Sequence, residues 1–298
     1  MSNKIYEIVT ERIITEMEKG NLPWKRPWVM AGEGAISHVT GKPYSMLNQW
    51  LLSQQGEYLT FNQARTEGGR VIKGSKAEMI VFFKLYKVTD TGKDGKQIDK
   101  TIPLLRYYNV FHISRCEGIK PKVVPEVLPK IFDPIEEAER VACEYSSRES
   151  IPIIHAQQNR AYYTPLLDQV TLPIKNQFSN SAEYYSTLYH ELAHSSGHQT
   201  RLNRFNSGCI WQESKDDYSK EELVAEITAA TILATIGIES ESSFSNNLAY
   251  IQSWISALRN DKSLIISAAS KAEKAVALIM DQNQVFTEEV VEEELKSE

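Results

Sequence analysis

The sequence has few of the residues that mark several common protein classes. Its three cysteines, Cys116, Cys143 and Cys209, lie far apart in a chain of 298 residues and form no CxxC pair. This spacing argues against a disulfide framework and against a thiolate zinc site. No run of about eighteen apolar residues occurs, so we expect no membrane-spanning segment. The start of the chain fits an amphipathic helix better than a secretion signal. These features together predict a cytoplasmic protein.

Charge is distributed unevenly along the chain. Residues 1–130 contain 20 Lys and Arg against 13 Asp and Glu, a balance of +7. Residues 131–298 contain 13 against 26, a balance of −13. The net charge of −6 therefore combines a basic front with an acidic back. Such an excess of cations predicts that the front half meets an anionic partner such as nucleic acid.

A proline-rich stretch accompanies this change of charge. Four prolines occur within EGIKPKVVPEVLPKIFDP, which is too many for a helix or a central strand. We therefore predict an extended linker at residues 121–134. It would separate a first domain at residues 1–120 from a second domain at residues 135–298.

The two predicted domains differ in their secondary structure. The first begins with a helix that ends at Gly20 and continues with runs rich in β-branched and aromatic residues. Two of these runs, EMIVFFKLYKV and TIPLLRYYNVFHI, flank the turn sequence TGKDGK and predict a hairpin. The second domain reads as one helix, three short strands (IPIIHA, RAYYTP and DQVTLPI) and four further helices, one of which ends at Gly237. The expected fold class is α+β: a small β-rich N-terminal domain linked to a mostly helical domain with a small sheet.

One helix of the second domain carries the sequence YYSTLYHELAHSSGHQTRLNR. Asn180 and Glu183 predict its start, because they can form a capping box. His190 and His194 lie four residues apart, about 40° around the helix axis, so both rings can face one ion. With Glu191 they form HExxH, in which two neutral imidazoles bind zinc and the glutamate takes a proton from the zinc-bound water. We expect one Zn²⁺ ion, although such ligands also accept other divalent metals.

His198 continues the same stripe of histidines but is not expected to be a ligand. It lies about 12 Å along a regular helix from His190, and zinc–nitrogen bonds are only about 2.0–2.1 Å long. Gly197 could end the helix, as it does in the longer metzincin motif HExxHxxGxxH. That motif would place its last histidine at position 201, which is Arg201 here. We therefore interpret His198 as a capping or loop residue.

The third ligand is expected from the later sequence SKEELVAEITAA. Glu222 and Glu226 lie four residues apart, an arrangement similar to gluzincins, in which one glutamate binds zinc and a later carboxylate orients a liganding histidine. We assign Glu222 as the ligand and Glu226 as the orienting residue, with Glu226 or Glu221 as substitute ligands. An alternative is an ordinary capping box between Ser219 and Glu222. Three ligands leave a coordination position open, which favours chemistry over a purely structural zinc site.

Basic and aromatic side chains alternate in the front half. This pattern suits single-stranded nucleic acid, because bases stack on aromatic rings while phosphates meet cations. The alternative is that the tryptophans are buried and the lysines merely solvated. The candidate residues are Trp24, Lys25, Arg26 and Trp28 in PWKRPW, and Arg70, Lys73 and Lys76 in GGRVIKGSK.

The order of these motifs resembles ArdC-type antirestriction proteins and the related TraC-type primase amino-terminal regions, which are encoded on plasmids and other mobile elements. In the N-terminal half, the resemblance rests on PWKRPW, TGKPYSMLNQWLL, YLTFNQA and GGRVIKGSKA. In the C-terminal half, it rests on YYTPLLDQVTLP, the HExxH stretch, YSKEELVAEITAA and YIQSWISALRNDKSLIISAASKAEKA. It covers nearly the whole chain.

The resemblance implies a single-stranded-DNA-binding N-terminal domain and a zincin-like metallopeptidase C-terminal domain. It also implies the metal set His190, His194 and Glu222, with Glu191 as the catalytic base. On the DNA side it adds Lys42, Tyr44 and Asn48. This sequence departs from the family by having Met46 and Leu47 before Asn48, and Tyr58 where a tryptophan is usual.

Two functions are compatible with this organisation. The first is a binding protein that coats incoming single-stranded DNA during conjugation and protects it from host restriction, with an auxiliary zincin-like domain. The alternative is an active zinc endopeptidase that cleaves a host or element-encoded protein and is localised by its N-terminal domain on DNA.

Overall fold

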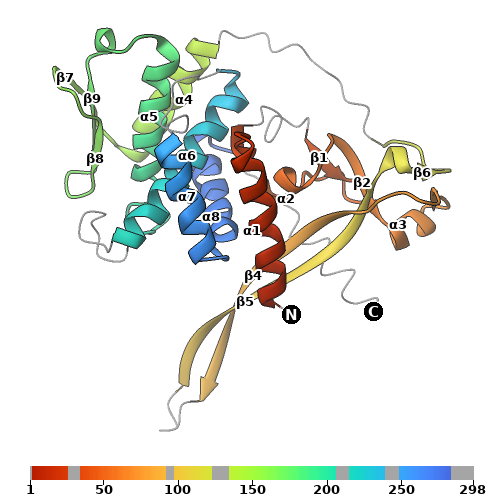
Figure 1. Cartoon of the computed structure of the whole chain (residues 1–298). Helices are drawn as coiled ribbons and strands as arrows, with labels where there is room; N and C mark the ends of the chain where they lie inside the picture. Colours follow the sequence, from red (N-terminus) through yellow and green to blue (C-terminus); the bar gives the residue numbers. More distant parts are fainter. Residues whose placement is uncertain are drawn as a thin grey trace. The chain divides into compact units, whose positions relative to one another are not determined.

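The computed structural model describes residues 2–25, 34–91, 97–122, 134–205, 215–238 and 248–282 (Figure 1). The described residues form two compact units. The first contains residues 2–11 and 34–122, and the second contains residues 12–25 and the described residues from 134 onward. Residues 12–25 therefore group with the second unit, which composition did not suggest. The predicted linker falls mostly on residues 123–133, outside the described residues.

Helix α1 (Ser2–Glu18) begins the chain as predicted. Val9, Ile13 and Met17 follow one another at four-residue spacing and are at most 1% exposed, so they form a buried stripe. Gly20 ends the helix in a left-handed conformation (φ +83°), and its N–H donates to the carbonyl of Met17. A short 3-10 turn, η1 (Pro23–Lys25), follows.

The first unit is built on a four-stranded sheet of order β1-β2-β5-β4. Its strands are β1 (Ala35–Ser37), β2 (Gly56–Thr60), β4 (Glu78–Thr91) and β5 (Gln97–His112). Strand β1 runs parallel to β2 with α2 (Met46–Leu51) between them in sequence, and the other pairs are antiparallel. The predicted hairpin is confirmed as β4–β5 (Figure 1), paired from Glu78↔Val110 to Thr91↔Gln97. The remaining elements are α3 (Phe61–Thr66), η2 (Ile113–Arg115), and the paired strands β3 (Arg70–Val71) and β6 (Cys116–Glu117).

Both faces of this sheet carry buried side chains, and one cluster of them belongs to the core of the first unit. Tyr58, Ile80 and Val110 come from three neighbouring strands and pack with Tyr44 in one cluster of buried residues. Tyr58 is completely buried, and its ring meets that of Tyr44 edge-on at 6.4 Å between centroids. The tyrosine at position 58 therefore fills an interior position of the first unit.

The second unit combines a small sheet with helices. The sheet has the order β7-β9-β8, with β9 parallel to β7 and antiparallel to β8. Its strands are β7 (Ile153–Ala156), β8 (Tyr162–Thr164) and β9 (Gln169–Pro173). The helices are α4 (Pro134–Glu149), α5 (Ser181–Ser195), α6 (Lys215–Ile236), α7 (Leu248–Asn260) and α8 (Leu264–Ile279), with η3 (Lys175–Gln177) before α5. These elements confirm the α+β class.

Helix α6 lies at the centre of this unit and contacts α5 and α8 (Figure 1). Its Leu223, Ile227 and Ile232 are completely buried, and Gly237 ends it with φ +90°, as predicted. Within the described ranges, no helix combines the length and the apolar character that crossing a bilayer requires.

Candidate metal centre and basic surface

Helix α5 begins at the predicted cap. The Asn180 side chain accepts a hydrogen bond from the Glu183 N–H at 2.9 Å, which satisfies one of the free donors of the first turn. Glu183 bends back but accepts from Ser179 N–H at 3.1 Å, one residue earlier than in a standard capping box. The defined start sets the rotation of the helix. It places both histidines of the motif on the side that faces α6.

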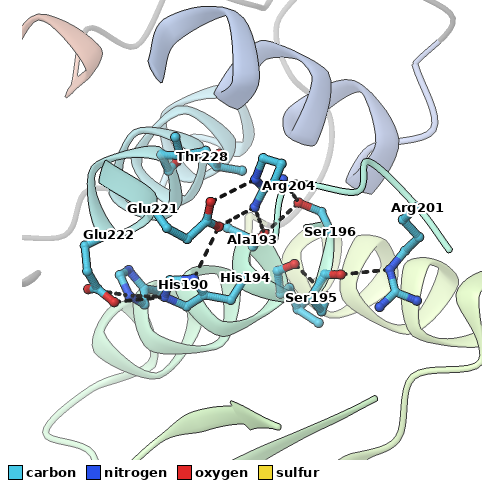
Figure 2. Close-up of polar contacts among 12 residues, drawn as sticks. His190, Ala193, His194, Ser195, Ser196, Arg201, Arg204, Glu221, Glu222 and Thr228 are labelled. Atoms are coloured by element: carbon cyan, nitrogen blue, oxygen red, sulfur yellow. Dashed lines mark hydrogen bonds and ion pairs between the residues drawn. The ribbon is translucent and has the colours of Figure 1, made fainter. Parts of the chain in front are cut away.

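Three side chains meet between α5 and α6 (Figure 2). His190 and His194 come from α5 with their Nε2 atoms 3.2 Å apart. Glu222 comes from α6, with one carboxylate oxygen 3.5 Å from His190 Nε2 and the other 3.3 Å from His194 Nε2. The structure therefore brings together the three residues predicted as ligands. Glu191, the predicted base, is buried on α5 directly beside His190.

The spacing of these atoms suits a divalent ion. Two ligands of a tetrahedral zinc ion with bonds of about 2.05 Å lie about 3.3 Å apart. The three separations of 3.2, 3.3 and 3.5 Å match that value. Two neutral imidazoles and a carboxylate are also donors that zinc and manganese accept. Among the described residues, His190, His194 and Glu222 are the one set of three acidic, histidine or cysteine side chains that lie close enough together to hold a metal.

The capping alternative for Glu222 is wrong. Helix α6 begins at Lys215, so Ser219 lies inside the helix and not at its N-cap. A serine in that position cannot form a capping box with the residue three positions later. The Glu222 carboxylate instead lies beside the imidazoles of His190 and His194 on α5.

Two further carboxylates lie behind the histidines. Glu226 reaches within 4.0 Å of His190 Nδ1, the nitrogen that does not face Glu222. Glu221 lies 3.5 Å from His194 Nδ1 in the same way. Carboxylates in this position fix the orientation of metal-binding imidazoles. The structure thus agrees with an orienting position for Glu226 and gives Glu221 the equivalent position on His194, which the sequence had suggested only as a substitute ligand.

Arg204 holds Glu221 in place and was not found from the sequence (Figure 2). Its Nε donates to Glu221 at 3.0 Å and its Nη2 donates to the other oxygen at 2.5 Å. Arg204 also donates to Ser196 Oγ and to the Ala193 carbonyl, both at 2.8 Å. A Cβ on Gly197 would lie 2.5 Å from the ring of Phe205, so glycine allows this close return of the chain. The sequence RLNR offers no pattern that distinguishes such an arginine from a solvated one.

His198 and Arg201 take the positions expected of non-ligands. His198 follows the end of α5, and its Nδ1 lies 2.8 Å from Thr200 Oγ1 in the turn. Arg201 donates to the Ser195 carbonyl at 2.8 Å (Figure 2). It also donates to Asp168 at 2.9 Å. It therefore links the end of α5 to the loop between β8 and β9.

The side chains of the metal centre are strongly coupled. Burial alone would lower the pKa of His194, but the carboxylates of Glu221 and Glu222 outweigh it and raise this pKa to about 10. Burial likewise opposes a rise in the pKa of His190, yet Glu222 and the charge of Glu191 raise it. Burial would raise the pKa of Glu222, but both histidines hold it far below its usual range. A proton and a metal ion therefore compete for the same imidazole nitrogens.

We expect metal binding to release protons. Only the neutral imidazole binds a metal, and the raised pKa of His194 keeps its ring protonated at neutral pH. The affinity for Mn²⁺ should therefore rise with pH, by about tenfold per pH unit for each proton displaced. Calorimetric titrations in two buffers with different ionisation enthalpies count these protons. An affinity that is constant between mildly acidic and mildly alkaline pH would contradict the coupling.

Three residues predicted to bind DNA are buried. Trp24 is completely buried in the second unit, where its ring meets Trp254 edge-on at 6.1 Å. Tyr44 belongs to the core of the first unit. The Asn48 amide donates to the Val81 carbonyl and accepts from the Val81 N–H, both at 2.8 Å, and so covers the edge of β4. The prediction that these three side chains contact DNA is wrong for this conformation, because their rings and amide are enclosed by protein.

The predicted cations are distributed differently. Arg70 is exposed but paired with Glu117 at 2.8 Å, and Lys73 and Lys76 are exposed. Lys42 is half-buried. Lys25 lies in η1 with its side chain undescribed, while Arg26 and Trp28 lie outside the described residues. Lys73 and Lys76 thus keep the accessibility that phosphate contacts require.

Comparison with known proteins covers both halves of the chain. Residues 3–111 match a family model described as the N-terminal domain of the anti-restriction factor ArdC. Residues 142–271 match a model described as a zincin-like metallopeptidase. Two crystal structures of the antirestriction protein ArdC from plasmid R388 are similar over 95% of this chain, one metal-free and one with Mn(II) bound. The matches span 98% of the metal-free chain and 99% of the Mn(II)-bound chain, with identities of 31% and 30% and TM-scores of 0.66 and 0.67.

Sequence relatives extend the comparison. DNA primase TraC of Escherichia coli is 31% identical over 302 residues, which is 94% of this chain but 20% of that protein. A second TraC primase is 32% identical and is covered over 27% of its length. An uncharacterized protein, y4eC, of Sinorhizobium fredii is 31% identical, over 91% of this chain and 89% of its own. The chain thus spans about a fifth to a quarter of the primases it matches.

Proposed function

Because this chain belongs to the ArdC family of antirestriction proteins, we propose that it binds single-stranded DNA and protects incoming DNA of a mobile element from host restriction. Its first unit is the DNA-binding part, and its second unit is a zincin-like part that holds a divalent metal. The protein would act in the cytoplasm of the recipient during conjugation. DNA is the proposed partner, and no contact with a membrane is required.

One observation carries this proposal. The similarity to the antirestriction protein of plasmid R388 extends over 95% of this chain and 98% of that chain, at 31% identity. A shared fold over one domain would not imply a shared function, but here both parts occur in the same order. The +7 balance of residues 1–130 adds physical support, because neutralising phosphates supplies most of the non-specific affinity for nucleic acid.

The second unit is proposed to hold one ion, Zn²⁺ or Mn²⁺, through His190, His194 and Glu222. Bound there, the metal would supply a Lewis acid with a coordination position open to solvent. Glu191 is buried, follows His190 directly in α5, and could accept a proton from water. Glu221 and Glu226 lie 3.5 and 4.0 Å from the Nδ1 atoms of His194 and His190 and would orient the two imidazoles from behind.

The endopeptidase alternative is not favoured, because the solved structures that match the whole chain are of an antirestriction protein. Glu191→Gln distinguishes the two functions, since it removes the proton acceptor without removing a metal ligand. Transfer of unmodified DNA into restricting and non-restricting recipients measures protection. Equal protection by the variant and the wild-type protein would exclude peptide hydrolysis as its cause.

We expect the protein to bind single strands more tightly than duplexes and to do so in a salt-dependent manner. Its cations would displace counterions, so the logarithm of the affinity should fall linearly with the logarithm of the salt concentration, with a slope of about −0.7 per neutralised phosphate. Fluorescence anisotropy with a labelled oligonucleotide and its duplex measures both effects. An affinity that does not depend on salt, or a preference for the duplex, would refute the proposed mode of binding.

A further inference from the structure

The burial of Trp24 and Tyr44 raises the question of where bases could stack. Among the described side chains of the first unit, two aromatic ones are exposed: Phe61 by 53% and Tyr107 by 52%. A single exposed apolar side chain is ordinary, but exposed rings that lie together mark an interaction site. Neither residue was among the DNA-binding candidates predicted from the sequence.

Tyr107 lies on the face of the sheet opposite the Tyr58 cluster, where it is exposed although its cross-strand neighbour Val81 is buried. Side chains alternate along β5, so Tyr107, Asn109 and Phe111 share one face. Tyr108 and Val110 face the other way and belong to the core cluster. Tyr107 and Asn109 are exposed and Phe111 is partly exposed, so these three consecutive outward positions are accessible to a ligand.

Phe61 follows the neighbouring strand directly. Thr60, the last residue of β2, pairs with Val110 of β5, so Phe61 leaves the sheet next to the outward row of β5. A complete capping box holds its backbone: the Thr60 hydroxyl accepts from Gln63 N–H at 3.2 Å, and the Gln63 side chain accepts from Thr60 N–H at 2.8 Å. The exposed ring is thus attached to a well-defined backbone. A ring whose backbone is already ordered loses less entropy on binding.

The overall charge of the first unit favours an anionic partner. Residues 34–122 contain 14 Lys and Arg against 7 Asp and Glu. Arg65 lies on α3 four residues after Phe61, on the same side of that helix, and is exposed. A protein partner that docks through aromatic residues would not require this excess of cations. Exposed rings among cations are the combination that binds single strands without reading their sequence.

We propose that Phe61, Tyr107 and Phe111 form a stacking platform for the bases of single-stranded DNA, with Arg65 meeting its phosphates. This inference rests on the proposed function and adds the surface that performs it. The platform would replace Trp24 and Tyr44 as the source of aromatic contacts. It predicts tolerance of base sequence, because every base offers a flat face for stacking.

Anisotropy titrations of the full-length protein with a labelled thymidine oligonucleotide test the platform. Phe61→Ala and Tyr107→Ala are each expected to weaken binding about tenfold, equivalent to about 1.4 kcal/mol. Phe61→Tyr and Tyr107→Phe should restore most of the affinity, because they keep a ring. The control Ile72→Ala removes a side chain that is 45% exposed in the same unit but is not aromatic, and it should change little. Thermal unfolding of each variant verifies that it is folded.

The salt dependence separates the two kinds of contact. The alanine variants of Phe61 and Tyr107 should keep the wild-type slope, whereas Arg65→Ala should reduce its magnitude by about 0.7. If the wild-type protein does not bind single-stranded DNA, the proposed function itself fails. If it binds and the variants Phe61→Ala and Tyr107→Ala bind equally well, only the platform is overturned, and the exposed rings would then belong to a protein interface.

Discussion

Replacement of Glu222 by alanine is expected to weaken the binding of Mn²⁺ or Zn²⁺ by more than about a hundredfold. The change removes one of three ligands, and even changes behind the ligands cost about 10- to 100-fold in affinity. It also leaves His190 and His194 facing each other, with Nε2 atoms 3.2 Å apart and no carboxylate between them. Calorimetry, or the electron paramagnetic resonance signal of free Mn²⁺, measures the change.

Matched variants decide whether Glu221, Glu222 or Glu226 is the ligand. Glu191→Gln should keep affinity within a few-fold of wild type, because Glu191 is not among the three ligand residues. Glu226→Gln and Glu221→Gln should weaken binding by an intermediate amount, since they only orient imidazoles. A larger loss in Glu226→Gln or Glu221→Gln than in Glu222→Ala would show that the ligand was assigned incorrectly.

Arg204→Ala is expected to lower the free energy of unfolding by about 3–5 kcal/mol, as is typical when one partner of a buried ion pair is removed. Both partners are almost fully buried, with side-chain exposures of 4% for Arg204 and 6% for Glu221. The change would leave the Glu221 carboxylate without its arginine and remove the donors to Ser196 and Ala193. Urea denaturation followed by circular dichroism measures the loss.

A second substitution separates the charge from the packing. Adding Glu221→Gln to Arg204→Ala removes the unpaired charge and should recover part of the stability. Arg204→Lys keeps the charge but not the two-pronged contact with Glu221, so it should fall between wild type and Arg204→Ala. A double variant that is less stable than Arg204→Ala alone would contradict the explanation by an unpaired carboxylate.

Local patterns predicted the elements of the fold well, because they depend on neighbours in the sequence. The alternation and turn residues of EMIVFFKLYKV, TGKDGK and TIPLLRYYNVFHI predicted the hairpin. The asparagine cap predicted the start of α5. The same reasoning wrongly allowed a capping box at Ser219, because a serine followed by glutamate three residues later occurs within helices as well as at their starts.

The predictions of DNA contacts failed where residue type was used to infer exposure. Trp24 sits in a motif of alternating rings and cations, yet its ring packs against Trp254, more than two hundred residues later in the chain. Asn48 is polar but completes the hydrogen bonding of an edge strand. Burial depends on which distant segments pack together, and neither a motif nor a composition contains that information.

The sequence by itself determined that His190 and His194 share one helical face with Glu191 beside them, because four-residue spacing on a helix sets that geometry locally. Only the tertiary structure decided that Glu222 meets them and that Glu221 and Glu226 stand behind them. The physical reason is that these contacts depend on how α6 is rotated against α5. That rotation is set by the packing of buried side chains from both helices, which no spacing within one segment reveals.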